Sequence, residues 1–279
     1  MSDRPGSLVL AACFALVFAA HADAQEIQPI VAPAPAAPEF MSRYEFHLSI
    51  ARLVPSTDTP GARATAVDER FAWDSRFGGS LDFADLVVAR LGVIVDYQAV
   101  MGSERQPFDP NQGNYTLEGF VSARVGPDTE VAGIFHHVSR HLSDRPKDFA
   151  IAYNEVGARV MRRLTRGTTT VDVDVEGGRT IQHSYVDYTW LGEAQLLVRH
   201  PINDKVGVFA HGSGQGFLVN DLVANRGMQG GALVEAGVRM TGRAGVLEIF
   251  AGYEKRVDAD PLDRLSQRWG LAGFRLLSR

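Results

Sequence analysis

The chain has 279 residues, a formal net charge of −5 and a single cysteine, Cys13. It contains no block of basic residues, so we expect no nucleic-acid partner. Because Cys13 falls within an N-terminal leader, disulfides and cysteine-based metal clusters are excluded from the mature chain.

The first residues have the pattern of a secretory signal peptide. Arg4 precedes an apolar run over residues 8–20, and Ala22-Asp23-Ala24 places small residues where a signal peptidase cleaves. The run is too short, and wrongly flanked, for a membrane-spanning helix. We therefore predict a signal peptide over residues 1–24.

The remainder divides into a short tether and one domain. Residues 25–41 are rich in Pro and Ala, which suits an extended periplasmic tether. In residues 42–279 no run approaches the roughly 18 to 20 apolar residues that a spanning helix needs. Instead, stretches such as residues 171–176 alternate an apolar residue with a charged one. Since successive strand side chains point to opposite faces, each stretch has one apolar and one polar wall.

That pattern on every strand is what a barrel with lipid outside and water inside requires. The predicted fold class is therefore all-β, a closed antiparallel transmembrane β-barrel of about 12 strands. The strands are expected near residues 43–53, 70–83, 86–99, 114–125, 129–139, 150–164, 168–180, 188–200, 205–215, 230–240, 245–256 and 268–278. The connections alternate between short and longer, as periplasmic turns and external loops do, which places both chain ends in the periplasm.

The polar wall carries charges of both signs at one level. Near the periplasmic end we expect Arg90, Arg124, Arg163, Arg199 and Arg239 together with Asp82, Asp172, Asp174 and Glu248. Facing pairs there would form a bidentate network that stiffens and partly closes the lumen. A barrel of this size is also narrower than the porins of 16 or more strands that hold an aqueous pore. A closing network is therefore favoured over a wide channel.

One segment, residues 135–144, carries residues suited to chemistry. Three of the eight histidines of the chain lie in it. His137 and Ser139 are two residues apart, so they share a face of the strand, with Cα atoms about 7 Å apart. If the hairpin register places Glu155 opposite His137, the three would form a nucleophile (Ser139), a general base (His137) and an orienting carboxylate (Glu155). The alternation assigns all three to the luminal wall.

The neighbours of this trio supply candidate binding groups. Arg140, His141 or a backbone N–H would be placed to stabilise an oxyanion, and His136 belongs to the same polar rim. We expect no metal and no cofactor. His137 and His141 lie four residues apart on an extended chain, about 13 Å, which is too far to share one ion.

The residues also carry two resemblances. His-x-Ser at the external end of a strand, with a carboxylate on the next strand, resembles the outer-membrane lipid A 3-O-deacylases over about twenty residues. That family has an eight-stranded barrel and typically Asn after the serine, where this chain has Arg140. The string formed by His136, Ser139, His141, Leu142 and Asp144 is similar to a family of uncharacterised bacterial barrel proteins, which implies a fold and a location but no activity.

Three classes of function stay open on this basis. The first is an integral outer-membrane barrel of undefined envelope role, with a polar His/Ser rim that binds loops or lipopolysaccharide headgroups. The second is an acyl-ester hydrolase that acts on outer-leaflet lipid through Ser139, His137 and Glu155. The third is a narrow passive channel. All three imply the outer membrane of a Gram-negative bacterium, with outer-membrane lipid, lipopolysaccharide and the barrel-assembly machinery as partners.

Overall fold

The computed structural model of the protein describes residues 31–55, 69–143, 145 and 147–278. The predicted signal peptide, residues 1–24, lies outside the described residues. Within the described ranges, no helix is long and apolar enough to cross a membrane.

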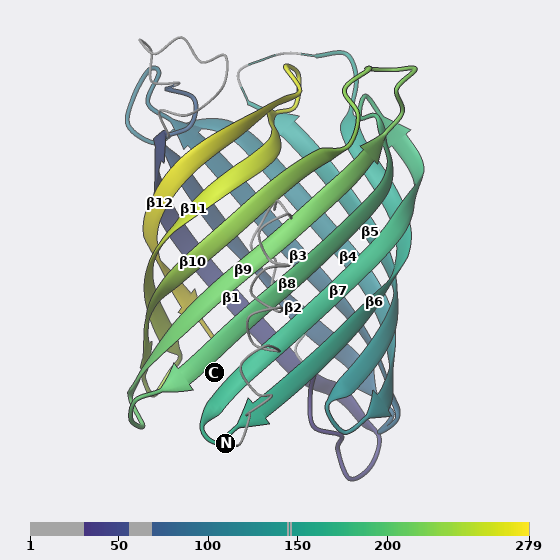
Figure 1. Ribbon diagram of the computed structural model, residues 1–279, viewed down its shortest axis with the longest axis vertical. Coiled ribbons are helices and arrows are strands. Elements are labelled where there is room, and N and C mark those ends of the chain that lie inside the picture. Colours follow the sequence, from purple (N-terminus) through teal and green to yellow (C-terminus); the bar gives the residue numbers. More distant parts are fainter. Residues whose placement is uncertain (1–30, 56–68, 144, 146, 279) are drawn as a thin grey trace, which may run out of the picture.

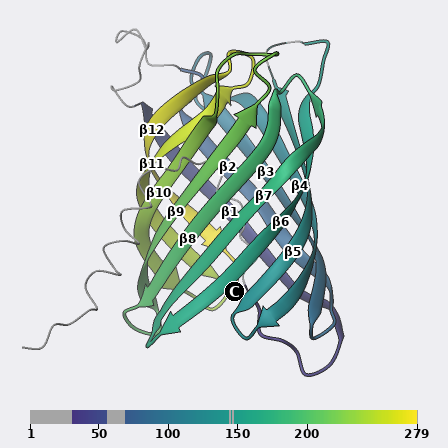
Figure 2. The same cartoon turned by 45° about the vertical axis from the view of Figure 1, so that its right-hand side comes forward.

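Twelve antiparallel strands form a closed barrel in which each strand pairs with its sequence neighbours and β1 pairs with β12 (Figure 1). They are β1 (Glu39–Pro55), β2 (Trp73–Asp85), β3 (Ala89–Gly102), β4 (Asp109–Gly126), β5 (Thr129–Leu142), β6 (Ile151–Arg166), β7 (Thr169–Ser184), β8 (Tyr188–Pro201), β9 (Val206–Val219), β10 (Gln229–Thr241), β11 (Val246–Asp260) and β12 (Leu265–Leu277). The predicted fold class is confirmed, and every predicted strand overlaps one of these. Figures 1 and 2 show the strands tilted against the barrel axis, as closure of a sheet requires.

The alternating apolar and polar residues of the sequence form the outer and inner walls of the barrel. On β3, Leu91 and Val95 are 47% and 49% exposed, whereas Ile94 and Asp96 between and beside them are buried. The outward set is apolar, as contact with acyl chains requires, and the inward set is mostly polar. The outer wall is therefore largely apolar, while the interior combines polar side chains with clusters of buried apolar residues.

The periplasmic half of the lumen is filled by paired charges. Arg90 donates to Glu130 through Nε and Nη2 at 3.0 and 2.7 Å, and through Nη1 to Asp82 at 2.9 Å. Arg124 forms a fork with both oxygens of Asp85 at 2.7 and 2.6 Å. Further pairs continue around the wall as Arg163–Asp172, Arg199–Asp172, Arg239–Glu248 and Arg275–Glu235.

The predicted pairing of luminal arginines with carboxylates is confirmed, with Asp85, Glu130 and Glu235 as further acidic partners. Removing one partner of a buried ion pair costs about 3–5 kcal/mol, because the other charge is left uncompensated. The pairs therefore hold the luminal wall in one arrangement. The narrow channel expected as one alternative would have to pass this level, and conductance across planar bilayers is the measurement that would test it.

The segment before β1 enters the same level of the lumen. Val31 is buried there and belongs to a cluster with Ile94, Phe120, Ala132, Ile134 and Met161. The carbonyl of Val31 accepts from Arg163 Nη1 at 3.3 Å, and the amide of Ala32 donates to Glu130 at 3.4 Å. β1 begins at Glu39, within the predicted tether of residues 25–41. The described end of that segment is thus held against the luminal wall.

At the external mouth, a loop is fixed beside a cluster of apolar side chains that includes Tyr188 and Phe217. Arg226, between β9 and β10, forms forks with Asp187 and with Asp258. Burial alone would lower the pKa of Arg226, but its hydrogen bonds to these two carboxylates outweigh that effect and raise it. Tyr188 donates to the same Asp258 at 2.6 Å and packs on Phe217, so the loop is tied to the aromatic cluster below it.

Candidate functional site

The facing of β5 decides where its polar segment lies. Val131 and Phe135 are 37% and 44% exposed on the outer wall, whereas His136 is buried in the lumen. Because side chains alternate, His137 and Ser139 share the outer wall with Val131 and Phe135. The predicted luminal facing of His137 and Ser139 is therefore wrong. The exposure of these two apolar residues shows that their side of β5 is the lipid-facing wall.

The register between β5 and β6 differs from the expected one by one residue. His136 lies opposite Glu155, and His137 lies opposite Asn154. A shift of one residue moves a side chain to the other wall. Glu155 is therefore fully buried on the luminal side, and the prediction that it shares a face with His137 and Ser139 is wrong.

Glu155 instead belongs to the packed lumen. Its carboxylate lies against Gly178 of β7, where an added Cβ would come within 2.1 Å of it and force the Glu155 side chain to shift. Below it, Arg159 donates to Glu118 at 2.7 Å and to Glu176 at 2.7 Å. These contacts give Glu155 a place in the luminal wall, with the sheet between it and Ser139.

Asn154 takes the position that Glu155 was expected to hold. Its Oδ1 lies 2.6 Å from His137 Nδ1, and its Nδ2 donates to Gln182 Oε1 at 2.8 Å. These three side chains, which we call the amide ladder (His137, Asn154, Gln182), cross β5, β6 and β7 on the outer wall. In this arrangement Asn154 Oδ1, which can only accept, faces His137 Nδ1, and in the neutral ring with Nδ1–H the other nitrogen, Nε2, is an acceptor.

Ser139 lies between two histidines of its own strand. His137 precedes it by two residues, and His141 follows it by two and meets the Ser139 Oγ through Nε2 at 3.1 Å. The ring of His141 contacts Tyr115 edge-on, with centroids 5.2 Å apart. Tyr115 continues into a row of aromatic rings with Tyr97 on the outer wall, which is typical of the aromatic belt at a membrane interface.

The outer wall beside this cluster carries few side chains. Gly133 on β5 pairs with Ala158, which pairs with Gly177, and the row continues to Gly192 on β8. A Cβ added at Gly133 would meet no atom within 4 Å, so the position opens directly onto the lipid side. This low row lies on the periplasmic side of His137, along the strand.

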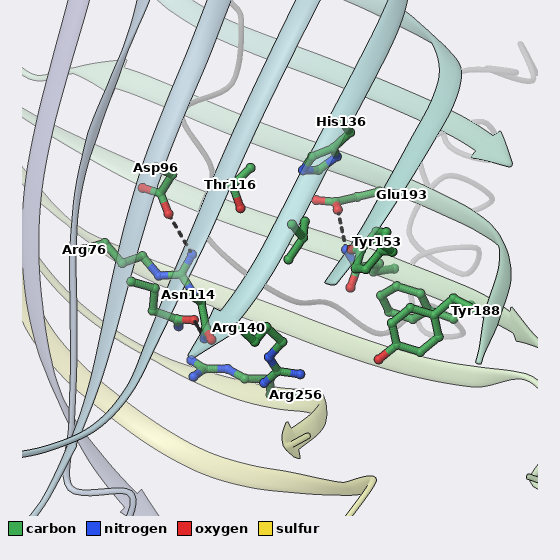
Figure 3. A pocket seen from close by; sticks show the side chains of 14 residues that line it. Arg76, Asp96, Asn114, Thr116, His136, Arg140, Tyr153, Tyr188, Glu193 and Arg256 are labelled. Carbon is green, nitrogen blue, oxygen red and sulfur yellow. Dashed lines mark hydrogen bonds and ion pairs between the residues drawn. The ribbon is translucent and has the colours of Figure 1, made fainter. Parts of the chain in front are cut away.

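The other predicted binding residues divide between the two walls. His141 lies outside beside Ser139, whereas His136 and Arg140 face the lumen. Arg140 donates weakly to Gln112 Oε1 and to the carbonyl of Ala259, at 3.4 and 3.3 Å. His136 and Arg140 line a cavity of about 90 Å³ in the external half of the lumen (Figure 3). Arg140 is thus on the wrong side of the sheet to stabilise an oxyanion at Ser139.

No group of three or more His, Cys, Asp or Glu side chains in the described ranges is arranged to hold a metal ion. Around Ser139, the outer wall brings together one hydroxyl, two imidazoles and two amides. A serine beside an oriented imidazole is the arrangement that activates a nucleophile.

No protein-family model matches the chain, and no curated protein matches it in sequence. Among solved structures it is similar to outer membrane phospholipase A from Escherichia coli, with a TM-score of 0.50 and 14% identity over 83% of this chain and 92% of that one. The outer membrane phospholipase of Salmonella typhi, a dimer with bound calcium, gives a TM-score of 0.50 and 13% identity over 84% and 90% of the two chains. LpxR from Salmonella typhimurium gives 0.44 and 6%, over 84% and 99%.

The protein is an outer-membrane β-barrel. At these identities the likeness shows the fold alone, and the fold agrees with the apolar outer wall described above. The barrel therefore lies in the outer membrane of a Gram-negative bacterium, as the sequence predicted.

Proposed function

We propose that this outer-membrane barrel is a serine-type acyl-ester hydrolase that acts on lipid of the outer leaflet. The observation that carries the proposal is the 2.6 Å contact between His137 Nδ1 and Asn154 Oδ1, on the wall that lipid touches. It leaves a basic Nε2 on a ring that shares a face with Ser139. An oriented base beside a serine hydroxyl is what acyl transfer needs.

The reaction follows from these groups. Ser139 Oγ attacks the ester carbonyl, while His137 Nε2 takes the hydroxyl proton and then gives it to the departing alcohol. Asn154 holds the ring and stabilises the imidazolium that forms. Water, activated by the same nitrogen, then attacks the acyl-serine, so that a fatty acid leaves and the serine is restored.

The hydrogen bond from Ser139 to His141 belongs to the resting arrangement. For attack, the hydroxyl rotates about χ1 from the His141 side to the His137 side. Hydrogen bonds between nucleophile and base are often loose in unliganded sites. Among the residues that the structure describes, His141 has no amide partner of the kind that Asn154 provides to His137, which is why His137 is assigned as the base.

The location supports a lipid substrate. Ser139 lies at the level of the outer aromatic belt, where ester groups of the outer leaflet meet the protein. The low row from Gly133 to Gly192 leaves space along the wall for acyl chains beside the serine. Two of the similar structures are phospholipases by name. Glycerophospholipid is therefore the first substrate to test, with lipopolysaccharide beside it.

The test uses the full mature chain, folded in detergent micelles. Fatty-acid release is measured from mixed micelles of phospholipid and, separately, of lipopolysaccharide. We expect release by the wild type and a loss of at least about a thousandfold in Ser139→Ala. Ser184→Ala, at the external end of β7, is the matched control and should keep full activity.

Folding is followed in the same samples by circular dichroism and by the gel mobility of unheated protein. Both variants should match the wild type in these measurements. No release by folded wild type from either lipid, or equal release by Ser139→Ala, would contradict the proposal.

A further inference from the structure

The pairing of β6 with β7 contains one irregularity, and it falls at the site. From Arg166–Thr169 up to Glu155–Thr180 the two strands pair residue by residue. The next residue of β6, Asn154, pairs with Gln182, so Ile181 has no partner. Such a bulge adds one residue to a strand and re-aims the side chains beyond it.

The bulge determines what lies next to Asn154. In unbroken pairing the neighbour of Asn154 would be Ile181, a side chain with no hydrogen-bonding group. With the bulge, Ile181 is 59% exposed on the outer wall, and Gln182 Oε1 accepts from Asn154 Nδ2 at 2.8 Å. The bulge thus places Gln182, rather than Ile181, beside Asn154 on the side away from His137.

This contact couples the orientation of the Asn154 amide to that of the Gln182 amide. When Nδ2 donates to Gln182, Oδ1 is the end that faces His137, and the ring must be protonated on Nδ1. If the amide were reversed, Nδ2 would donate to Nδ1, and the single proton of the neutral ring would lie on Nε2. A ring in that tautomer cannot take a proton from Ser139.

The geometry points to Gln182 as a positioning residue that sets the His137 tautomer through Asn154. This inference rests on the proposed function, in which His137 Nε2 is the base. Gln182 touches neither the serine nor the ring. Its effect passes entirely through the direction of two hydrogen bonds in the amide ladder.

Three substitutions separate that effect from simple loss of a contact. Gln182→Glu keeps an acceptor toward Asn154 Nδ2 and should keep kcat within about threefold of the wild type. Gln182→Met removes the acceptor and frees the amide to turn, so we expect a kcat about tenfold lower. Gln182→Lys offers only donors, which hold the amide reversed, and should lower kcat about a hundredfold or more, as the wrong tautomer does in serine hydrolases.

KM should stay within about twofold in all three, because Gln182 is not assigned to substrate binding. Gln267→Met on β12 makes the same chemical change far from the ladder and serves as the matched control. A loss in Gln182→Glu as large as that in Gln182→Met would show that only shape matters and would overturn the inference.

A second readout does not depend on activity. In micelles, ¹⁵N-histidine NMR reports which ring nitrogen carries the proton, and the His137 signal is assigned by its loss in His137→Ala. We expect the Nδ1–H tautomer in the wild type and Gln182→Glu, and the Nε2–H tautomer in Gln182→Lys. An unchanged His137 signal in Gln182→Lys would overturn the inference, whether or not the protein hydrolyses lipid. If the NMR signals change as expected but no lipid is hydrolysed, the proposed function is wrong and the role of Gln182 in setting the His137 tautomer still holds.

Discussion

The two walls of the barrel use opposite chemistry at neighbouring rungs of one hairpin. Inside, His136 lies opposite Glu155, in a lumen held by arginine–carboxylate forks such as Arg159 with Glu118. Outside, His137 lies opposite Asn154, and the Asn154 and Gln182 amides of the ladder carry no formal charge. Charged side chains on a lipid-facing barrel wall are destabilising, increasingly so with depth. An orienting group on that wall is therefore better supplied by an amide than by a carboxylate.

If the two walls differ in this way, replacing two adjacent histidines should have very different effects on activity. This pair gives the largest expected effect. His137→Ala should lower kcat/KM for phospholipid by about a thousandfold or more, since the general base is gone. His136→Ala, one residue away but in the lumen, should stay within about fivefold, because no atom of it reaches the outer wall. Steady-state fatty-acid release measures both. Comparable losses in the two variants would break the distinction between the walls.

The luminal half of the comparison predicts a loss of stability without a loss of chemistry. Arg90→Met leaves Glu130 and Asp82 without their shared partner, at a cost of about 3–5 kcal/mol of unfolding free energy. Reversible urea unfolding in lipid vesicles measures this, with Val93→Ala on the outer wall of the same strand as control. The activity of the folded fraction should be that of the wild type. A change below about 1 kcal/mol would mean that water replaces the lost pair.

The smallest expected effect tests whether the amide of Asn154 or the carboxylate of Glu155 orients His137. Asn154→Ala should lower kcat about a hundredfold, since His137 loses the acceptor that holds its tautomer. Glu155→Gln should change kcat less than about threefold, because it lies on the other wall. If instead Glu155→Gln were the damaging change, the original expectation of a carboxylate partner would be right and the register assignment wrong. Kinetics on the same phospholipid decide between them.

The barrel could be predicted from sequence because a period of two over a dozen strands leaves little choice of fold. In strands such as β3, the apolar residues Leu91 and Val95 face outward and Asp96 faces inward, so the sequence alone indicates which side of the strand faces lipid. The luminal charges were predicted for the same reason: once a strand faces one way, every second residue follows. Strand ends were less well predicted. β4, for example, begins at Asp109 rather than near residue 114, because the polar rim above the membrane has no alternation to mark it.

Sequence reasoning found the position of the candidate site but not the set of residues that lie together there. His137 and Ser139 were found, while Asn154 and Gln182 were missed. The register across β5 and β6 depends on the connection of residues 143–150, whose length does not fix it, unlike the tight turn between β6 and β7. A signal was present in β6: Val156 and Val160 must face lipid, so Asn154 faces it too and Glu155 does not. The bulge at Ile181 had no such signal, because its effect is visible only when the partner strand is in place.

Ile181 is a single residue added to an otherwise regular ladder. Deleting it would leave Gln182 directly after Thr180, still opposite Asn154. What the extra residue adds is therefore one more apolar side chain on the outer wall, at the level of the amide ladder and toward the acyl chains.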